Sequence, residues 1–255
     1  LFCIPKERDN PKLPCTLHCP PSGDSPYIII YNHAMTTDLG RIRESMEELV
    51  KYLGVYVIAY DYSGHGIATD ENVTTSEQST SRDGMIVCNY VQNQLSWPAE
   101  RIILFGHGIG SGVAASCALK AQQQGSMVMG LFLQSTFTCI RDVSKALFGF
   151  WGNIVMNRFN NREVLQKLRC PLLLAHGKKD DIMPYAMSVS LMEEYVGNET
   201  KLFHHAADAS HFDMSVKNDI AVPLSKFISL IEQVRQRDNV IIPNIPKHDY
   251  QSWLS

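Results

Sequence analysis

A glycine-rich turn between an apolar strand and a helix is the first part of this sequence that could carry chemistry. Residues 101–105 form a short apolar run, residues 106–110 are Gly-His-Gly-Ile-Gly, and a helix-like segment follows. A nucleophilic serine can be held on such a sharp strand-to-helix turn, in the pattern G-x-S-x-G, where small neighbours let strand and helix approach closely. Gly108 stands at the serine position, so the turn predicts a nucleophile frame without its nucleophile.

Two other interpretations of this turn exist. An ordinary glycine-rich turn would also fit the five residues taken alone. A phosphate-binding loop would need a lysine followed by serine or threonine after the glycines, and that pattern is not matched. The choice therefore depends on whether an acid and a base follow later in the chain.

An acid and a histidine do follow, in the order nucleophile, acid, base that one class of serine hydrolase uses. The loop after the predicted strand at residues 171–175 carries Asp180 and Asp181, and sites of open parallel sheets form at the carboxyl ends of strands. We select Asp180 as the acid and His211, after the next predicted strand, as the base. We expect His107 to be a packing or hydrogen-bonding side chain rather than a second base.

Two backbone amides are candidates for an oxyanion hole. One donor of such a hole is the residue after the nucleophile, which is Ile109, and the other comes from the loop after an early strand. The predicted strand at residues 27–31 leads into the loop 32–40, so the Met35 amide is the candidate for the second donor of the oxyanion hole. These donors belong to the backbone, so the hole does not require the serine.

Metal sites are the weaker alternatives. One candidate set consists of His204, His205, Asp208, His211 and Asp213, and another of Cys15, His18 and Cys19. Adjacent strand residues point to opposite faces, which separates His204 from His205. The second set has no further Cys/His pair nearby at ligand spacing. We therefore predict no metal and no cofactor.

Short apolar runs alternate with helix-length segments, a pattern typical of a parallel sheet covered by helices on both faces. Strands are expected at residues 27–31, 55–60, 101–105, 127–133, 171–175 and 201–204. Helices are expected at residues 39–53, 80–95, 111–124, 185–196 and 222–236. The sequence predicts an α/β fold with a mostly parallel central sheet.

The 255 residues, 45% of them hydrophobic, suit one such domain. We place it at residues 25–236, after an N-terminal extension at residues 1–24 and before a C-terminal tail at residues 237–255. Residues 136–162 exceed an ordinary connection and are expected to form a cap. Its apolar stretch at 146–156 predicts either a helix docked on the core or, through Phe148, Phe150 and Trp151, a wall that binds an acyl chain.

Composition limits the partners and the compartment. The net charge is −3 and no basic run occurs, so nucleic acid and anionic membranes are not expected to bind. No apolar run reaches the roughly 18 to 20 residues of a membrane span, and no signal-peptide pattern is visible. The chain begins at Leu1, which leaves a removed targeting segment open. Seven cysteines, four of them in predicted core elements (Cys88, Cys117, Cys139 and Cys170), favour free thiols in the cytoplasm.

Several motifs resemble the alpha/beta-hydrolase domain-containing 17 group. These are HAMTTDLG at residues 33–40, YDYSGHG at 60–66, TSE at 75–77 and the glycine-rich turn at 101–110. The likeness covers about residues 25–232 and implies an α/β-hydrolase fold with a short cap. Members of the group are membrane-associated serine hydrolases that remove palmitate from protein cysteines, so a small-molecule acyl or acylated-protein substrate is implied. The group's lipid-modified amino-terminal segment is not recognisable, so membrane association and oligomeric state stay open.

Two residues depart from that group's pattern. Gly108 replaces the nucleophilic serine and Ala34 replaces the glycine of the oxyanion motif. Loss of a triad serine lowers kcat about a millionfold, so impaired or absent hydrolysis is expected. Three hypotheses follow: a pseudohydrolase that binds an acyl or peptide ligand, an active hydrolase that uses Ser111 or a water activated by His211, or an engineered variant of an active parent.

Overall fold

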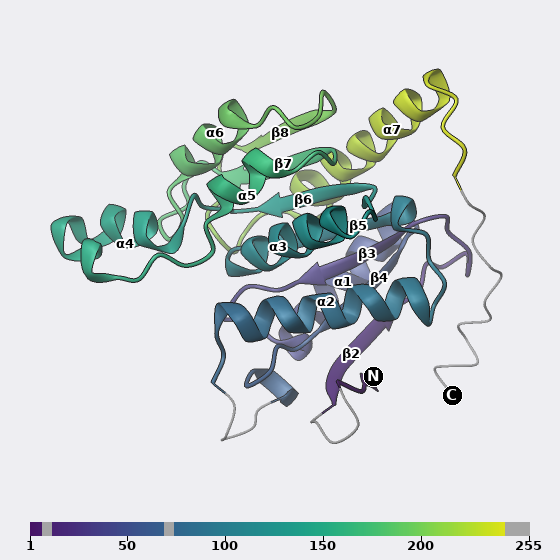
Figure 1. Cartoon of the computed structure of the whole chain (residues 1–255), viewed down its shortest axis with the longest axis horizontal. Coiled ribbons are helices and arrows are strands. Elements are labelled where there is room, and N and C mark those ends of the chain that lie inside the picture. Colours follow the sequence, from purple (N-terminus) through teal and green to yellow (C-terminus); the bar gives the residue numbers. More distant parts are fainter. Residues whose placement is uncertain (7–11, 69–73, 243–255) are drawn as a thin grey trace.

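One mixed sheet forms the centre of the molecule. A computed structural model describes residues 1–6, 12–68 and 74–242, and within them eight strands lie in the order β1-β2-β4-β3-β5-β6-β7-β8 (Figure 1). The strands are β1 (Phe2–Ile4), β2 (Leu13–His18), β3 (Ile28–Asn32), β4 (Tyr56–Tyr60), β5 (Ile102–His107), β6 (Gly130–Gln134), β7 (Leu172–Gly177) and β8 (Lys201–Ala206). Strands β3 to β8 run parallel, whereas β1 and β2 pair antiparallel. The predicted α/β class with a mostly parallel sheet is confirmed.

Helices cover both faces of this sheet. The α-helices are α1 (Leu39–Leu53), α2 (Glu77–Asn93), α3 (Ile109–Gln123), α4 (Ile140–Phe148), α5 (Asn161–Lys167), α6 (Tyr185–Glu194) and α7 (Val222–Arg237). Short helices of other types are η1 (Gly66–Ala68), η2 (Ala99–Arg101), η3 (Gly149–Ile154) and the π-helix η4 (Val216–Ala221). In the part of the chain that the structure describes, none of the helices has the length and apolar character of a bilayer span.

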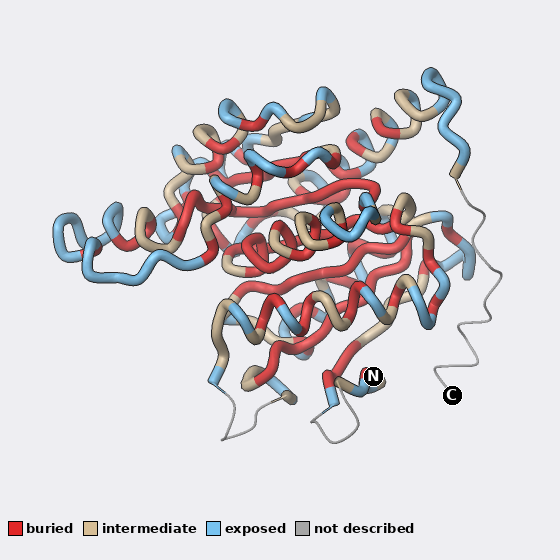
Figure 2. The backbone as a smooth tube through the Cα atoms, viewed as in Figure 1, coloured by how far each residue is buried: buried red, intermediate tan, exposed pale blue. Residues whose placement is uncertain are grey.

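Alternation along the strands creates two apolar layers. In β3, Ile28 and Ile30 face the layer that contains residues of α2 and α3, while Ile29 and Tyr31 face the layer of α1 and α7. Successive strand side chains point to opposite faces, so a strand buried on both faces is apolar throughout. The central strands β3 to β7 are accordingly buried along their whole length, whereas β1 and β8 at the two sides of the sheet are mostly not (Figure 2). The sheet edge at the carboxyl ends of β3, β5, β7 and β8 is thereby fixed as a rigid support for loops.

The N-terminal extension expected at residues 1–24 contributes strands to this same sheet. β2 pairs with β4, with Cys15 opposite Tyr60, and β1 pairs with β2. Leu13 and Cys15 are fully buried. The sheet therefore begins within that segment, because a strand at the edge needs only a few apolar residues and a partner.

The cap at residues 136–162 contains α4, η3 and the beginning of α5. Its apolar stretch does not form one helix docked on the core, so that interpretation is wrong. α4 ends at Phe148, and Gly149 takes a φ of 58° that turns the chain into η3. Phe148, Phe150 and Trp151 are 66%, 81% and 72% exposed. The segment protrudes from the domain beside the helical layer (Figures 1 and 2).

Candidate active site

Gly108 joins β5 to α3 in a conformation that few residues adopt. Its φ of 54° and ψ of −122° lie outside the regions open to side-chain-bearing residues and would cost such a residue about 1–3 kcal/mol. The turn is fixed by its backbone: the Gly108 N–H donates to the Gln134 carbonyl at 3.0 Å, and the Gly108 carbonyl accepts from the Ser111 N–H at 2.9 Å. Glycine at this position therefore removes a strain that the turn would impose on any other residue.

The flanking glycines are required by close packing. A Cβ on Gly106 would collide with the backbone of Gly110 and Ser111, and a Cβ on Gly110 would collide with the carbonyl of Asn32. These contacts let the first turn of α3 lie directly against β5 and β3. The local sequence thus dictates the sharp strand-to-helix turn that was predicted at residues 106–110.

Asp180 and His211 meet at the same sheet edge. Asp180 lies in the loop after β7 and His211 in the loop after β8, and Nδ1 of His211 donates to Oδ2 of Asp180 at 2.8 Å. Both side chains are buried, while the neighbouring Asp181 is exposed. The carboxylate fixes the ring so that Nε2 is the nitrogen left for other partners.

Nε2 of His211 points at Gly108. A Cβ built on Gly108 would lie 3.2 Å from this nitrogen and 3.5 Å from the Cβ of Ala34. The first distance is shorter than ordinary van der Waals contact, so a side chain at position 108 would require His211 to move by a few tenths of an ångström. The structure therefore brings Gly108, Asp180 and His211 together, with the histidine close against the glycine.

A second histidine, missed by the sequence reasoning, also contacts Asp180. His176, the penultimate residue of β7, is fully buried and its Nε2 lies 3.2 Å from Oδ2 of Asp180. The backbone N–H groups of Ile182 and Met183 donate to the other oxygen at 3.0 and 2.7 Å. Burial alone raises the pKa of Asp180, but hydrogen bonds from His176, His211 and Met183 outweigh it and hold that pKa well below its usual range. The carboxylate is therefore ionised at neutral pH.

His107 lies beside this pair as a neutral packing residue. Its Nε2 donates to the carbonyl oxygen of His211 at 3.1 Å, and the two rings are 5.0 Å apart. Burial, and then the neighbouring His211, lower the pKa of His107 to about 3. The side chain holds the His211 loop in place, in agreement with its predicted packing and hydrogen-bonding role.

The loop that carries Met35 is held by hydrogen bonds from the segment after β4. The Tyr62 hydroxyl donates to the His33 carbonyl at 2.9 Å, His65 Nε2 donates to the Met35 carbonyl, and Asp61 accepts from the Leu39 N–H at 2.9 Å. Ile109 is the first residue of α3, and N–H groups of a first helical turn have no acceptor within the helix. Both proposed oxyanion donors thus belong to segments adjoining Gly108, which Ala34 also approaches.

The proposed substitute nucleophile lies elsewhere. Ser111 is fully buried, and its hydroxyl exchanges a hydrogen bond of 2.8 Å with Thr136. Asn161 Nδ2 approaches both hydroxyls, at 3.5 and 3.3 Å. Ser111 is therefore engaged in a polar cluster under the cap, with no contact to His211 among its hydrogen bonds in the described residues.

The candidate metal ligands have separate partners. His204 bonds Asp219 at 2.9 Å and Asp208 bonds Lys179 at 2.8 Å. Within the described ranges, no group of three or more His, Cys, Asp or Glu side chains is placed to hold a metal ion. The cysteines predicted for core elements, Cys88, Cys117, Cys139 and Cys170, are all buried and free.

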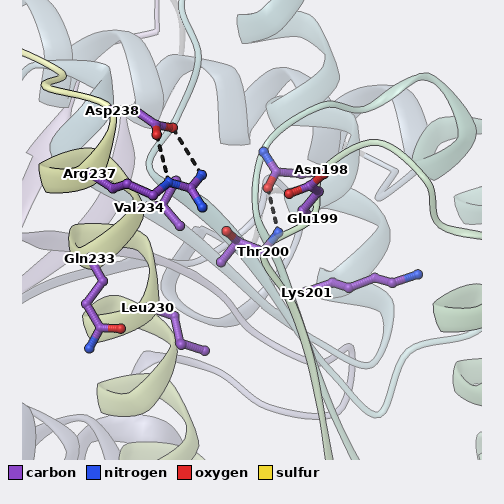
Figure 3. A pocket seen from close by; sticks show the side chains of 9 residues that line it. All are labelled: Asn198, Glu199, Thr200, Lys201, Leu230, Gln233, Val234, Arg237 and Asp238. Atoms are coloured by element: carbon purple, nitrogen blue, oxygen red, sulfur yellow. Dashed lines mark hydrogen bonds and ion pairs between the residues drawn. The ribbon is translucent and has the colours of Figure 1, made fainter.

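Two hollows in the surface differ in their relation to this site. The larger, about 620 Å³, lies where the chain enters β8 and α7 ends, and its polar groups include the pairs Arg237–Asp238 and Asn198–Thr200 (Figure 3). It is at the amino end of β8, whereas His211 follows the carboxyl end. A second cavity of about 260 Å³, between α1 and the sheet, reaches His107 and Phe212. Phe148, Phe150 and Trp151 do not line either of these hollows.

The fold is that of the α/β hydrolases. The family model of serine aminopeptidase, S33, matches residues 24–165, which is more than half of the chain and includes Gly108. The chain therefore belongs to this family of hydrolases. The match ends before Asp180 and His211, whose juxtaposition comes from the structure.

Relatives and solved structures agree with this assignment. The chain is 24% identical over 227 residues to the alpha/beta hydrolase domain-containing protein aho-3 of Caenorhabditis elegans, covering 89% of this chain and 64% of that protein. It is 26% identical over 182 residues to the lysophosphatidylserine lipase ABHD12 of Danio rerio, covering 65% of this chain and 46% of that lipase. The chain thus spans under two thirds of these relatives.

Two structural neighbours share the fold at low identity. Est1E from Butyrivibrio proteoclasticus, with ferulic acid bound, has a TM-score of 0.67 at 17% identity over 92% of this chain and 99% of that one. The monoacylglycerol lipase of Paleococcus ferrophilus has a TM-score of 0.62 at 18% identity over 86% of this chain and 99% of that one. At such identities the likeness speaks for the fold alone.

Proposed function

We propose that this chain is a hydrolase-family protein for acyl esters or thioesters in which Gly108 occupies the nucleophile position, so that it forms no acyl-enzyme. The observation that carries the proposal is the direction of His211: its Nε2 lies 3.2 Å from where a Cβ on Gly108 would be. In a serine hydrolase that nitrogen removes the proton of the attacking hydroxyl. Here no hydroxyl is available at that place.

The retained parts favour an acyl ligand. A buried, ionised Asp180 orients His211, and the Ile109 and Met35 amides are the donors we assign to the ligand's carbonyl oxygen. The names of the relatives and neighbours include lipases and an esterase domain, which favours carboxylic esters of lipids. The resemblance to the depalmitoylating group adds palmitoyl thioesters of proteins. Without a nucleophile such a ligand binds and is released unchanged, or is cleaved slowly by a water that His211 activates.

Hydrolysis by the chain and by Gly108→Ser tests the proposal. Acetyl and palmitoyl esters of para-nitrophenol and a palmitoylated cysteine peptide serve as substrates, and a fluorophosphonate probe reports a reactive serine. We expect labelling and turnover only in Gly108→Ser, with a gain of about 10³-fold or more over the unchanged chain. Adding His211→Ala to Gly108→Ser should abolish both.

Two outcomes would overturn the proposal. Unlabelled turnover by the unchanged chain that His211→Ala removes would indicate rapid direct attack by water, and labelling that Ser111→Ala removes would indicate a substitute nucleophile. Saturable binding of a palmitoyl ligand without turnover would instead establish the pseudohydrolase form of the proposal. An engineered Ser-to-Gly change would give the same results as a natural one, so the encoding gene decides between those origins.

A further inference from the structure

The protruding part of the cap presents apolar side chains to solvent. We call this group the cap patch; it consists of Leu147, Phe148, Phe150, Trp151, Ile154, Val155 and Met156. Their exposure ranges from 37% for Val155 to 81% for Phe150. A large exposed apolar patch marks a contact with another protein, a membrane or a ligand.

The packing of η3 against α4 holds these side chains outward. Gly152 is buried against the backbone of Ser144 and Lys145, where any Cβ would collide, so η3 lies directly on α4. Arg141 Nε donates to the Val155 carbonyl at 3.1 Å, and the Ile140 N–H donates to the Arg158 carbonyl at 3.0 Å. The cap patch is therefore displayed by a structure with its own backbone restraints, and its exposure does not depend on a loose loop.

The net charge of −3 led to the expectation that anionic membranes do not bind, but the segment that carries the cap patch is locally positive. Arg141, Lys145 and Arg158 flank it, and Asp142 is the one acidic residue between Cys139 and Arg162. That carboxylate lies 3.6 Å from Arg162 and 3.8 Å from Lys145 and accepts a hydrogen bond from Thr138. Within residues 139–162 the exposed aromatic and aliphatic groups are thus accompanied by several cations and one paired acid. Glu77 of α2 also reaches this segment, where it accepts from the Phe159 N–H at 2.8 Å.

We propose that the cap patch docks the protein on an anionic lipid surface, with its aromatic side chains at the boundary between headgroups and acyl chains. Amphipathic elements with Trp, Phe and Leu on one side and Lys or Arg beside them bind membranes in this way. Tryptophan and tyrosine favour this boundary because their rings are both apolar and polar.

The position of the cap gives the docking a consequence. The cap begins at the carboxyl end of β6, between the loops of β5 and β7 that carry Gly108 and Asp180. A lipid surface that contacts the cap patch would lie beside this sheet edge. The docking itself needs no turnover, so its test is independent of the proposed function.

Vesicle flotation of the full chain tests this inference. We expect binding to phosphatidylcholine vesicles that contain phosphatidylserine, and affinity at least about tenfold lower for Phe150→Ser/Trp151→Ser. Val196→Ser/Val222→Ser removes two exposed apolar side chains elsewhere, 82% and 57% exposed, and should bind as the unchanged chain does. Lys145→Glu/Arg158→Glu should lose about fivefold or more per charge on anionic vesicles only. Urea unfolding of each variant verifies that folding is unchanged.

Three results would overturn the inference. The first is an unchanged chain that does not float with vesicles that contain phosphatidylserine. The second is equal binding by Phe150→Ser/Trp151→Ser and the unchanged chain. The third is a dimer in vesicle-free buffer that Phe150→Ser/Trp151→Ser converts to a monomer, which would assign the cap patch to a second copy of the chain.

Discussion

The Nε2 atom of His176 lies 3.2 Å from Oδ2 of Asp180, the oxygen that also accepts from His211. The same nitrogen is 2.9 Å from the Met183 carbonyl, which can only accept, so the hydrogen of His176 is on Nε2. Its Nδ1 then accepts from the Ser188 hydroxyl at 2.6 Å. Asp180 is therefore positioned by His176 as well as by His211, the histidine that it orients.

His176→Ala should destabilise the protein by about 1–3 kcal/mol, because the Ser188 hydroxyl loses a buried partner and Asp180 loses a donor. His176→Gln, which keeps a donor, should recover part of this loss. Urea unfolding at neutral pH measures both. In the Gly108→Ser background, His176→Ala should also move the acid limb of the pH–rate profile to higher pH. Equal profiles with and without His176→Ala would limit His176 to a packing role.

Substitution of Gly108 separates backbone strain from chemistry. Gly108→Ala and Gly108→Ser should each lose about 1–3 kcal/mol of unfolding free energy, since both side chains must accept the positive φ. Only Gly108→Ser should gain hydrolytic activity. Unfolding midpoints compared with ester turnover check this, and unchanged stability in both variants would show that the turn relaxes freely.

Ala34 should limit the activity that a serine introduced at position 108 can reach. A Cβ built on Gly108 would lie 3.5 Å from the methyl group of Ala34 and 3.2 Å from Nε2 of His211. Removing the methyl in Ala34→Gly/Gly108→Ser should raise kcat/KM over Gly108→Ser by about tenfold, because small misplacements of reacting groups are costly. Rates of fluorophosphonate labelling measure the effect; equal rates would exclude crowding by Ala34.

His107 predicts a loss of stability in mild acid. Its pKa is about 3 in the folded protein and about 6.5 in the unfolded chain, so only the unfolded chain gains a proton as the pH falls below 6.5. Stability is unaffected above that value and is lost progressively down to about pH 3. At about pH 5 the free energy of unfolding is lower by about 2 kcal/mol because of His107.

His107→Gln isolates this contribution, because glutamine can still donate to the His211 carbonyl without titrating. Its unfolding free energy should fall about 2 kcal/mol less than that of the unchanged chain between about pH 7.5 and pH 5. Equal losses in the two proteins would assign the acid sensitivity to other groups, such as the buried His33, whose pKa burial also lowers.

Local signals made the elements readable from sequence. The helix at residues 39–53 matches α1 because Asp38 caps its first turn and Gly54 ends it in a left-handed conformation. α2 begins at Glu77, three residues before the expected start, since Ser76 and Ser79 form a reciprocal cap. Asp180 and His211 could be selected because loops at the carboxyl ends of parallel strands converge in any fold of this class.

Features that depend on distant partners could not be read in this way. β2 is a strand because it pairs with β4, which lies far along the chain. The residue pattern of Leu13–His18 has no periodicity that predicts this strand. The role of His176 depends on the approach of Asp180 and Ser188 within the folded protein. The cap residues have the composition of a core, and only the turn at Gly149 and the packing at Gly152 decide that they face solvent.

The packing of Gly106 and Gly110 bears on how related sequences should be sorted. Neither residue can gain a side chain without displacing α3 from the sheet, so selection for folding alone is enough to keep both. Retention of the two glycines in a lineage is accordingly silent about catalysis. A survey that scores the pattern by these two glycines will not separate chains with serine at position 108 from chains with glycine there, so position 108 is the one to tabulate.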